Sequence, residues 1–137
     1  MRFVLQLRSY FRASVCGVVL FLGVIAPSAA FALDVAVVMD PIGAIKIAKD
    51  TTFAMLLEAQ RRGYELHYME MADLYLINGE AHARTRLVTV EQNYDKWYEF
   101  GSEQDIQLAD LDVILMRKDP PFDTEFIYAT YILERAE

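Results

Sequence analysis

A short apolar segment that runs into charges, prolines and a new helical pattern constrains the fold of this chain most strongly. Residues 112–116 read as a buried strand, and residues 117–119 are all charged. Pro120 and Pro121 end the strand because proline donates no backbone hydrogen bond and restricts the residue before it. A helical pattern begins at Asp123 or Thr124. Such a connection is typical of an open α/β sheet, whose ligands lie at the carboxyl ends of the strands.

The region before residue 70 predicts a β-α-β unit. Leu33 to Met39 is almost continuously apolar, as expected for a strand covered on both faces. After a connection at 40–49, Asp50 or Thr51 begins a helix that runs to Arg62, and Gly63 ends it. Residues 65–69 give a second strand, and the crossover should be right-handed. The inner face of the helix is predicted to carry Phe53, Leu56, Leu57 and Gln60.

The middle of the chain predicts a β-hairpin. Residues 75–77 and 81–90 flank Asn78-Gly79, a strong signal for a tight turn. The aromatic stretch 93–100 reads as another strand or a covering loop. We therefore predict an α/β, Rossmann-like domain whose sheet is mainly parallel, with a β-hairpin insertion. The last helix is expected to carry its apolar face on Phe126, Ile127, Thr130, Tyr131 and Leu133.

Residues 1–32 have the three parts of a secretory signal. A basic start precedes an apolar run at about 15–26, and the segment ends in an Ala-x-Ala pattern at Ala32. The apolar run is short for a membrane span. Three interpretations stay open: a working signal cleaved after Ala32, an artefactual leader from a misplaced start, and a membrane anchor, the least favoured. A working signal would place the protein in the periplasm or outside the cell.

The composition of residues 33–137 excludes several classes of protein. The leader holds three of the 13 basic residues and none of the 20 acidic ones, so the remainder is strongly acidic. Nucleic-acid binding, which requires a basic face, is therefore not expected. Cys16 is the only cysteine and the chain has two histidines, His67 and His82, so we predict neither a disulfide framework nor a metal site.

Four blocks of sequence resemble the amino-terminal domain of the prokaryotic glutathione synthetase family, which are ATP-grasp ligases. They are VMDP at 38–41, FAMLLEAQRRGYELHYMEM at 53–71, DLYLINGEA at 73–81 and the whole of 108–137. The resemblance covers residues 33–137 and implies a pre-ATP-grasp domain, truncated at its carboxyl end.

The resemblance implies a role in joining γ-glutamylcysteine to glycine with ATP and Mg²⁺, in the cytoplasm. The parts that bind ATP and Mg²⁺ in this family would follow residue 137, so we expect this chain to hold no cofactor and to be inactive alone. One alternative is a non-catalytic module that binds γ-glutamyl peptides or glutathione. The other is one part of a split ligase, which assembles with a separate ATP-grasp partner or with copies of itself. We predict no stable membrane span.

The candidate substrate-binding residues end two predicted strands. Asp40 follows the first strand, and Arg117, Lys118 and Asp119 follow the 112–116 strand. If the strands are neighbours, Arg117 and Lys118 can bind a substrate carboxylate, and Asp40 or Asp119 can accept from an ammonium group. The alternative is purely structural, with Arg117 paired to Asp40 or Asp119. Alternation along the strand points Lys118 away from Arg117.

Two further features favour ordinary structural roles. The connection at 41–49 can contact an anion at the start of the following helix, or a peptide substrate through Ile42, Gly43 or Lys46. A single glycine does not make a phosphate-binding motif, so an ordinary connection is favoured. A row of basic side chains on the hairpin strand is most simply a solvated face, although it can attract an acidic partner. The row consists of His82, Arg84 and Arg86.

Overall fold

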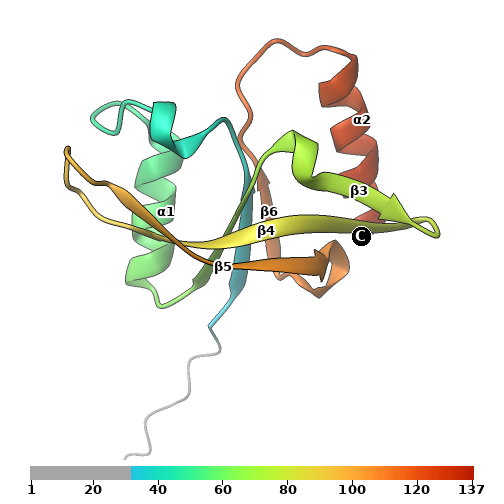
Figure 1. The fold of residues 1–137 in the computed structure, drawn as a ribbon, viewed down its shortest axis with the longest axis horizontal. Helices are drawn as coiled ribbons and strands as arrows, with labels where there is room; N and C mark the ends of the chain where they lie inside the picture. Colours follow the sequence, from blue (N-terminus) through green and yellow to red (C-terminus); the bar gives the residue numbers. More distant parts are fainter. Residues whose placement is uncertain (1–31) are drawn as a thin grey trace, which may run out of the picture.

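Six strands and two α-helices make up residues 32–137, the part of the chain that the computed structural model describes (Figure 1). The predicted leader lies outside the described residues, except for Ala32, so it stays a prediction. Among residues 32–137, no helix is both long enough and apolar enough to cross a membrane. The elements are β1 (Asp34–Val38), α1 (Thr51–Arg61), β2 (Glu65–Met69), β3 (Leu74–Ile77), β4 (Glu80–Val90), β5 (Tyr98–Gln107), β6 (Val113–Met116) and α2 (Thr124–Leu133), with short 3-10 turns η1 (Ile42–Ala44), η2 (Met71–Asp73), η3 (Leu108–Asp110) and η4 (Glu134–Ala136).

The sheet is mixed and curled, which corrects the prediction of a mainly parallel sheet. Its order is β3-β4-β2-β1-β6, and β5 pairs with β4. β1 is parallel to both β2 and β6, as the β-α-β pattern predicted. However, β4 is antiparallel to β2, β3 and β5. The physical reason is the length of β4, whose 11 residues present two edges along which three strands pair (Figure 1).

The predicted hairpin is confirmed. β3 and β4 pair from Leu74↔Ala83 to Ile77↔Glu80. The two turn residues, Asn78 and Gly79, have φ angles of 53° and 90°. A two-residue hairpin turn needs positive φ at both central positions, and asparagine and glycine tolerate it best.

The aromatic stretch at 93–100 forms only the beginning of a strand. β5 starts at Tyr98 and continues through residues 101–107, which are mostly polar and which the sequence did not suggest as a strand. The backbone pairing with β4 holds this segment extended, so it needs no apolar alternation of its own. The register shifts opposite Leu87, where Gly101 lies so close that a Cβ on it would be 3.2 Å from the Leu87 Cβ.

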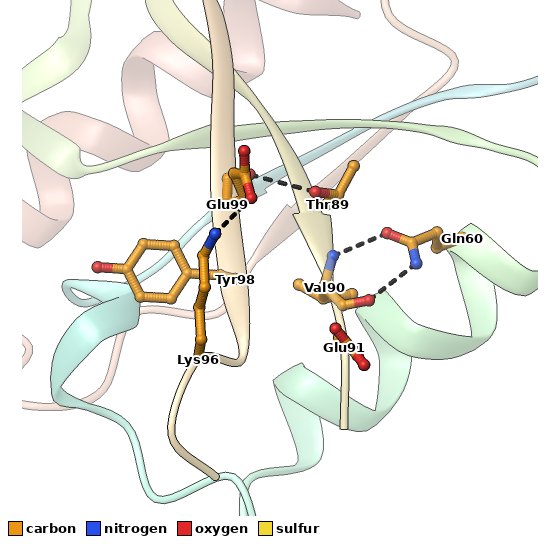
Figure 2. Close-up of a pocket in the computed structure, with 7 residues that line it drawn as sticks. All are labelled: Gln60, Thr89, Val90, Glu91, Lys96, Tyr98 and Glu99. Atoms are coloured by element: carbon orange, nitrogen blue, oxygen red, sulfur yellow. Dashed lines mark hydrogen bonds and ion pairs between the residues drawn. The ribbon is translucent and has the colours of Figure 1, made fainter. Parts of the chain in front are cut away.

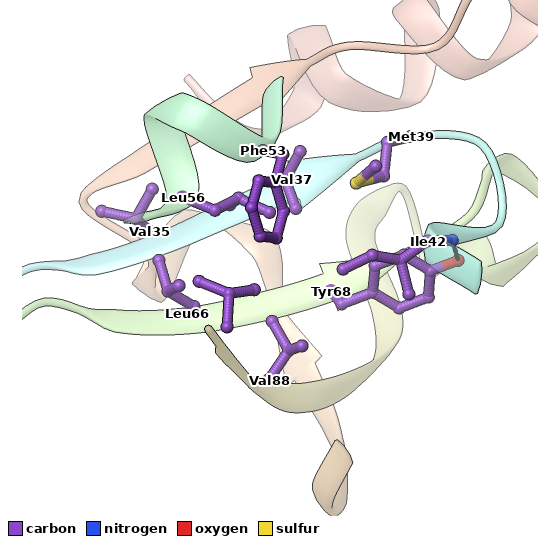
Figure 3. Close-up of a cluster of buried hydrophobic side chains, with 10 residues drawn as sticks. Val35, Val37, Met39, Ile42, Phe53, Leu56, Leu66, Tyr68 and Val88 are labelled. Atoms are coloured by element: carbon purple, nitrogen blue, oxygen red, sulfur yellow. Dashed lines mark hydrogen bonds between the residues drawn. The ribbon is translucent and has the colours of Figure 1, made fainter. Parts of the chain in front are cut away.

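Helix α1 covers one face of the sheet, as predicted. Asp50 begins it by accepting a hydrogen bond from the Phe53 backbone N–H at 2.7 Å, and Gly63 follows its end with φ +82°. Phe53 and Leu56 are buried, with Leu57 packed against the same cluster. Figure 3 shows the Phe53 and Leu56 side chains meeting those of β1 and β2. The buried cluster consists of Val35, Val37, Met39, Ile42, Phe53, Leu56, Leu66, Tyr68, Val88 and Val90.

Helix α2 covers the opposite face with only part of the predicted set, of which Phe126, Thr130 and Leu133 are half-buried. Asp123 caps it through the Phe126 backbone N–H at 3.0 Å. Ala129 is its buried residue, whereas Ile127 and Tyr131 are 46% and 57% exposed. The second cluster is built largely from small side chains, which lets helix and sheet approach closely; its members are Ala36, Val38, Met69, Leu74, Ala81, Ala83, Leu108 and Ala129.

Candidate functional site

The carboxyl ends of β1 and β6 lie side by side, which confirms the predicted spatial relation. Val38 pairs with Met116, and the Arg117 backbone N–H donates to the Val38 carbonyl at 2.8 Å. This pairing carries Asp40 and the 117–119 segment to one edge of the sheet, called here the carboxyl rim. The rim is therefore defined by Asp40, Arg117, Lys118 and Asp119.

An ion pair joins the two strand ends at the carboxyl rim. Lys118 Nζ lies 2.8 Å from Asp40 Oδ1, and the Asp119 backbone N–H donates to Asp40 Oδ2 at 3.1 Å. Lys118 also donates to the Asp119 carbonyl at 2.8 Å. Its side chain is 19% exposed, against 36% for Asp40. The partner of Asp40 is therefore Lys118, not Arg117 as the structural alternative supposed, and both oxygens of Asp40 are already engaged.

Arg117 points to the other side of the sheet, toward the start of α1. Its Nε donates to Thr52 Oγ1 at 3.1 Å, and its Nη2 donates to Thr51 Oγ1 at 2.9 Å. Neutral hydroxyls hold the guanidinium in place without cancelling its charge. Since arginine has five N–H donors in a planar fork, donors remain for a carboxylate. The residue is exposed, so a ligand at the rim can reach it.

The connection between β1 and α1 is fastened to the core, which supports its interpretation as an ordinary connection. The Ile42 backbone N–H donates to the Tyr68 hydroxyl at 3.3 Å, and Trp97 Nε1 donates to the Ile42 carbonyl at 2.9 Å. Tyr68 in turn donates to Glu70 at 2.6 Å. Burial, and then the bond to Glu70, raise the pKa of the Tyr68 phenol well above its ordinary value. Tyr68 therefore acts as a neutral structural bridge.

The connection between β1 and α1 does not form a phosphate cradle. A Cβ on Gly43 would lie 3.0 Å from the Tyr98 hydroxyl, so close packing accounts for the one glycine of the connection. The carboxylate of Asp50 caps α1, and it disfavours a phosphate at this helix end. Phosphate binding is accordingly not assigned to this connection or to the start of α1.

A hollow of about 310 Å³ lies between α1 and the end of the β4-β5 ribbon. Figure 2 shows that its polar groups are paired with one another: the Gln60 amide both donates to and accepts from the Val90 backbone at 2.8 Å. Lys96 and Glu99 form an ion pair at 2.6 Å, which raises the pKa of the lysine and lowers that of the glutamate. These contacts fasten β4 to α1, and they leave few groups for a ligand.

The basic row on β4 is packed against aromatic rings rather than simply solvated. The Arg86 guanidinium lies 4.1 Å from the centre of the Phe100 ring and 5.2 Å from that of Tyr68. His82 stacks on Tyr75 at 5.8 Å, and Arg84 lies 5.9 Å from the same ring. Sequence reasoning missed these contacts because they depend on the cross-strand register.

Comparison with known proteins identifies close relatives. The family model described as the N-terminal domain of prokaryotic glutathione synthetase matches residues 33–137. The glutathione synthetases of Salmonella typhimurium (strain LT2) and of Escherichia coli O127:H6 are 85% and 82% identical over 105 residues, and that of Escherichia coli K12 is 75% identical. Each alignment covers 77% of this chain and 33% of the relative. The chain therefore spans about a third of the length of these curated relatives.

Proposed function

Because the chain belongs to the prokaryotic glutathione synthetase family, as its N-terminal domain, we propose that it forms the substrate-side wall of a glutathione synthase. In the proposed reaction, the cysteinyl carboxylate of γ-glutamylcysteine is joined to the amine of glycine with consumption of ATP. The identity of 75–85% to glutathione synthetases over 105 residues supports this.

The carboxyl rim carries the proposed substrate contacts. Arg117 is an exposed cation held by Thr51 and Thr52, and it can bind a substrate carboxylate through two parallel N–H groups. Asp119 is exposed and can accept from the α-ammonium group of the γ-glutamyl residue. Asp40 and Lys118 neutralise each other, so their proposed role is to hold the two strand ends together and to position Arg117 and Asp119.

In this proposal, ATP and Mg²⁺ are held by an ATP-grasp part of the family enzyme, which we place in the two thirds of the relatives' length that the chain does not span. We accordingly propose that residues 33–137 act as a Rossmann-like pre-ATP-grasp domain and work in the cytoplasm, where ATP is present. Binding of γ-glutamylcysteine or glutathione without catalysis is the alternative outcome of the experiments below.

A chimera tests the proposal most directly. Residues 33–137 replace the equivalent third of the Salmonella typhimurium enzyme, and steady-state kinetics are measured with γ-glutamylcysteine, glycine and ATP. We expect Arg117→Ala to raise the KM for γ-glutamylcysteine or glycine at least tenfold, because one charge-assisted contact is worth about 1.5 to 3 kcal/mol.

The matched control is Arg61→Ala, since Arg61 is an exposed arginine that pairs with Glu58 on α1, apart from the rim. It should leave both KM values unchanged. Equal kinetics for the two variants would contradict the assignment of Arg117. The purified 137-residue chain, assayed with all three substrates and Mg²⁺, should form no glutathione; product formation would overturn the proposed division of labour.

A further inference from the structure

We propose that Asp34, Glu65 and His67 form a binding site for a divalent transition-metal ion of the Zn²⁺ type. The three residues lie at the amino ends of β1 and β2, at the opposite end of these strands from the carboxyl rim. One ligand atom from each lies within 4.8 Å of the other two. The inference is independent of the proposed ligase function.

The strand register explains why these side chains meet. Asp34 pairs with Glu65 across the parallel strands, and Ala36 pairs with His67. Side chains directly opposite each other, and those two residues apart, lie on the same face of a sheet. Asp34, Glu65 and His67 therefore project from one face at one edge, although 30 residues separate the first two in sequence.

His67 provides an observation that an ordinary acidic cluster lacks. It is 4% exposed, and its Nε2 is the one buried side-chain nitrogen or oxygen atom in residues 32–137 that makes no hydrogen bond. Nε2 lies 3.5 Å from Glu65 Oε1, without hydrogen-bond geometry. A buried polar atom without a partner costs about 1 to 3 kcal/mol. This nitrogen faces the Glu65 carboxylate, and an oxygen of Asp34 belongs to the same group of ligand atoms, which is the surrounding expected of a metal ligand.

The other ring nitrogen of His67 is oriented by a neighbouring strand. Nδ1 lies 3.5 Å from Thr85 Oγ1, and the Thr85 hydroxyl donates to the Gln104 carbonyl. With the hydroxyl proton used in that way, we assign Thr85 as the acceptor and the ring proton to Nδ1. The Nε2 lone pair then faces Glu65, and a cation between them relieves the repulsion. Metal-binding histidines typically have such a support on the second nitrogen.

The donor set selects the class of ion. One imidazole and two carboxylates suit Zn²⁺, which takes three protein ligands and leaves a position for water. Mg²⁺ and Ca²⁺ prefer oxygen ligands alone, so the imidazole disfavours them. The Glu65 side chain is 51% exposed, so it can close onto an ion that enters from solvent. A bound ion would join β1 to β2 at their amino ends.

Calorimetric titration tests the site. ZnSO₄ is titrated into the 137-residue chain after treatment with a chelator, with Cys16→Ser in every sample so that no thiolate competes. We expect one ion per chain, and at least tenfold weaker binding in Glu65→Gln and in His67→Gln. Glu65 is half-exposed, so its variant keeps the test valid if replacement of buried His67 prevents folding.

His82 is the matched control, because it is the other histidine and lies 4.0 Å from Glu80 on β4. His82→Gln should bind Zn²⁺ as the parent does. Co²⁺ should give visible absorption bands that disappear in Glu65→Gln. No binding of one ion by the parent chain, binding unchanged in Glu65→Gln, or loss of binding in His82→Gln would each overturn the proposal.

Discussion

Polar side chains gather at both ends of β1, but their hydrogen-bond partners differ. At the carboxyl rim, Asp40 is engaged by Lys118 and by the Asp119 backbone. At the amino end, the buried Nε2 of His67 has no hydrogen-bond partner and faces Glu65 at 3.5 Å. At one end of β1, both carboxylate oxygens of Asp40 therefore have partners, whereas at the other end one nitrogen of His67 has none.

This difference distinguishes side chains whose polar atoms are paired within the protein from side chains that keep a donor or acceptor atom for a ligand. The ion pair of Lys118 and Asp40 holds β6 to β1, so it cannot also serve as a free binding group. Arg117 keeps unused donors because it is held by neutral hydroxyls, and His67 keeps a free nitrogen because its other nitrogen contacts Thr85. Replacement of residues at the two ends should therefore have different consequences.

The largest effect is expected from Tyr68→Phe, next to the carboxyl rim. The change leaves the buried Ile42 N–H without its acceptor and the Glu70 carboxylate without its donor. We expect a loss of about 2 kcal/mol in the free energy of unfolding. Urea denaturation followed by Trp97 fluorescence measures it, and Tyr128→Phe, at a residue 63% exposed, should have no effect.

Lys118→Met should have a smaller effect at the same edge. It removes the cation from Asp40 while the methionine retains apolar contacts, and we expect a loss of about 1 kcal/mol in the free energy of unfolding. The same measurement on Lys96→Met provides the control, because the pair of Lys96 and Glu99 is 68% exposed on both sides and should contribute less. Equal losses would show that the rim pair is no more than a surface contact.

His67→Leu should cost less still, although His67 is buried. In the chelator-treated chain the imidazole leaves one polar atom unsatisfied, so we expect its replacement to change the free energy of unfolding by less than about 1 kcal/mol. The variant should also lose any rise in Tm that Zn²⁺ gives the parent. A loss as large as that of Tyr68→Phe would indicate that the metal-free histidine is fully satisfied.

The smallest effect on the free energy of unfolding is expected from Glu58→Gln, which removes the exposed ion pairs of Glu58 with Arg61 and Arg62. Hydrogen bonds from Arg61 and Arg62 lower the pKa of Glu58 from 4.5 to about 2. A lowered pKa in the folded state stabilises the protein above the unfolded value and less as the pH falls toward the folded value. The small stability difference between the parent and Glu58→Gln should thus be constant above pH 4.5 and disappear toward pH 2. Thermal unfolding across this range measures it.

Local patterns predicted the elements that depend on local physics. The caps of Asp50 and Asp123, the Asn78-Gly79 turn and the apolar β1 segment all form as expected, because each is determined by interactions within a few residues. The face of α2 was predicted only in part, since that helix is apolar almost all round and its periodicity does not select a face. The second half of β5 was missed because its strand conformation comes from pairing with β4.

The candidate sites divide in the same way. The position of Asp40 and residues 117–119 at strand ends could be read from the sequence, but the pairing of Lys118, rather than Arg117, with Asp40 could not. The grouping of His67 with Asp34 and Glu65 was also missed. Two histidines and no cysteine beyond residue 32 argued against a metal site, and the Asp34 carboxylate comes from a neighbouring strand, which carries no sequence signature.

By itself, the sequence determined the order of the helices and strands, the acidic character of residues 33–137 and the resemblance to the glutathione synthetase family. Only the tertiary structure decided which face of α2 is buried, that the sheet is mixed, and which charges at the ends of β1 have partners. The reason is physical: caps and turns depend on neighbours along the chain, whereas register and side-chain pairing depend on strands that meet only after folding.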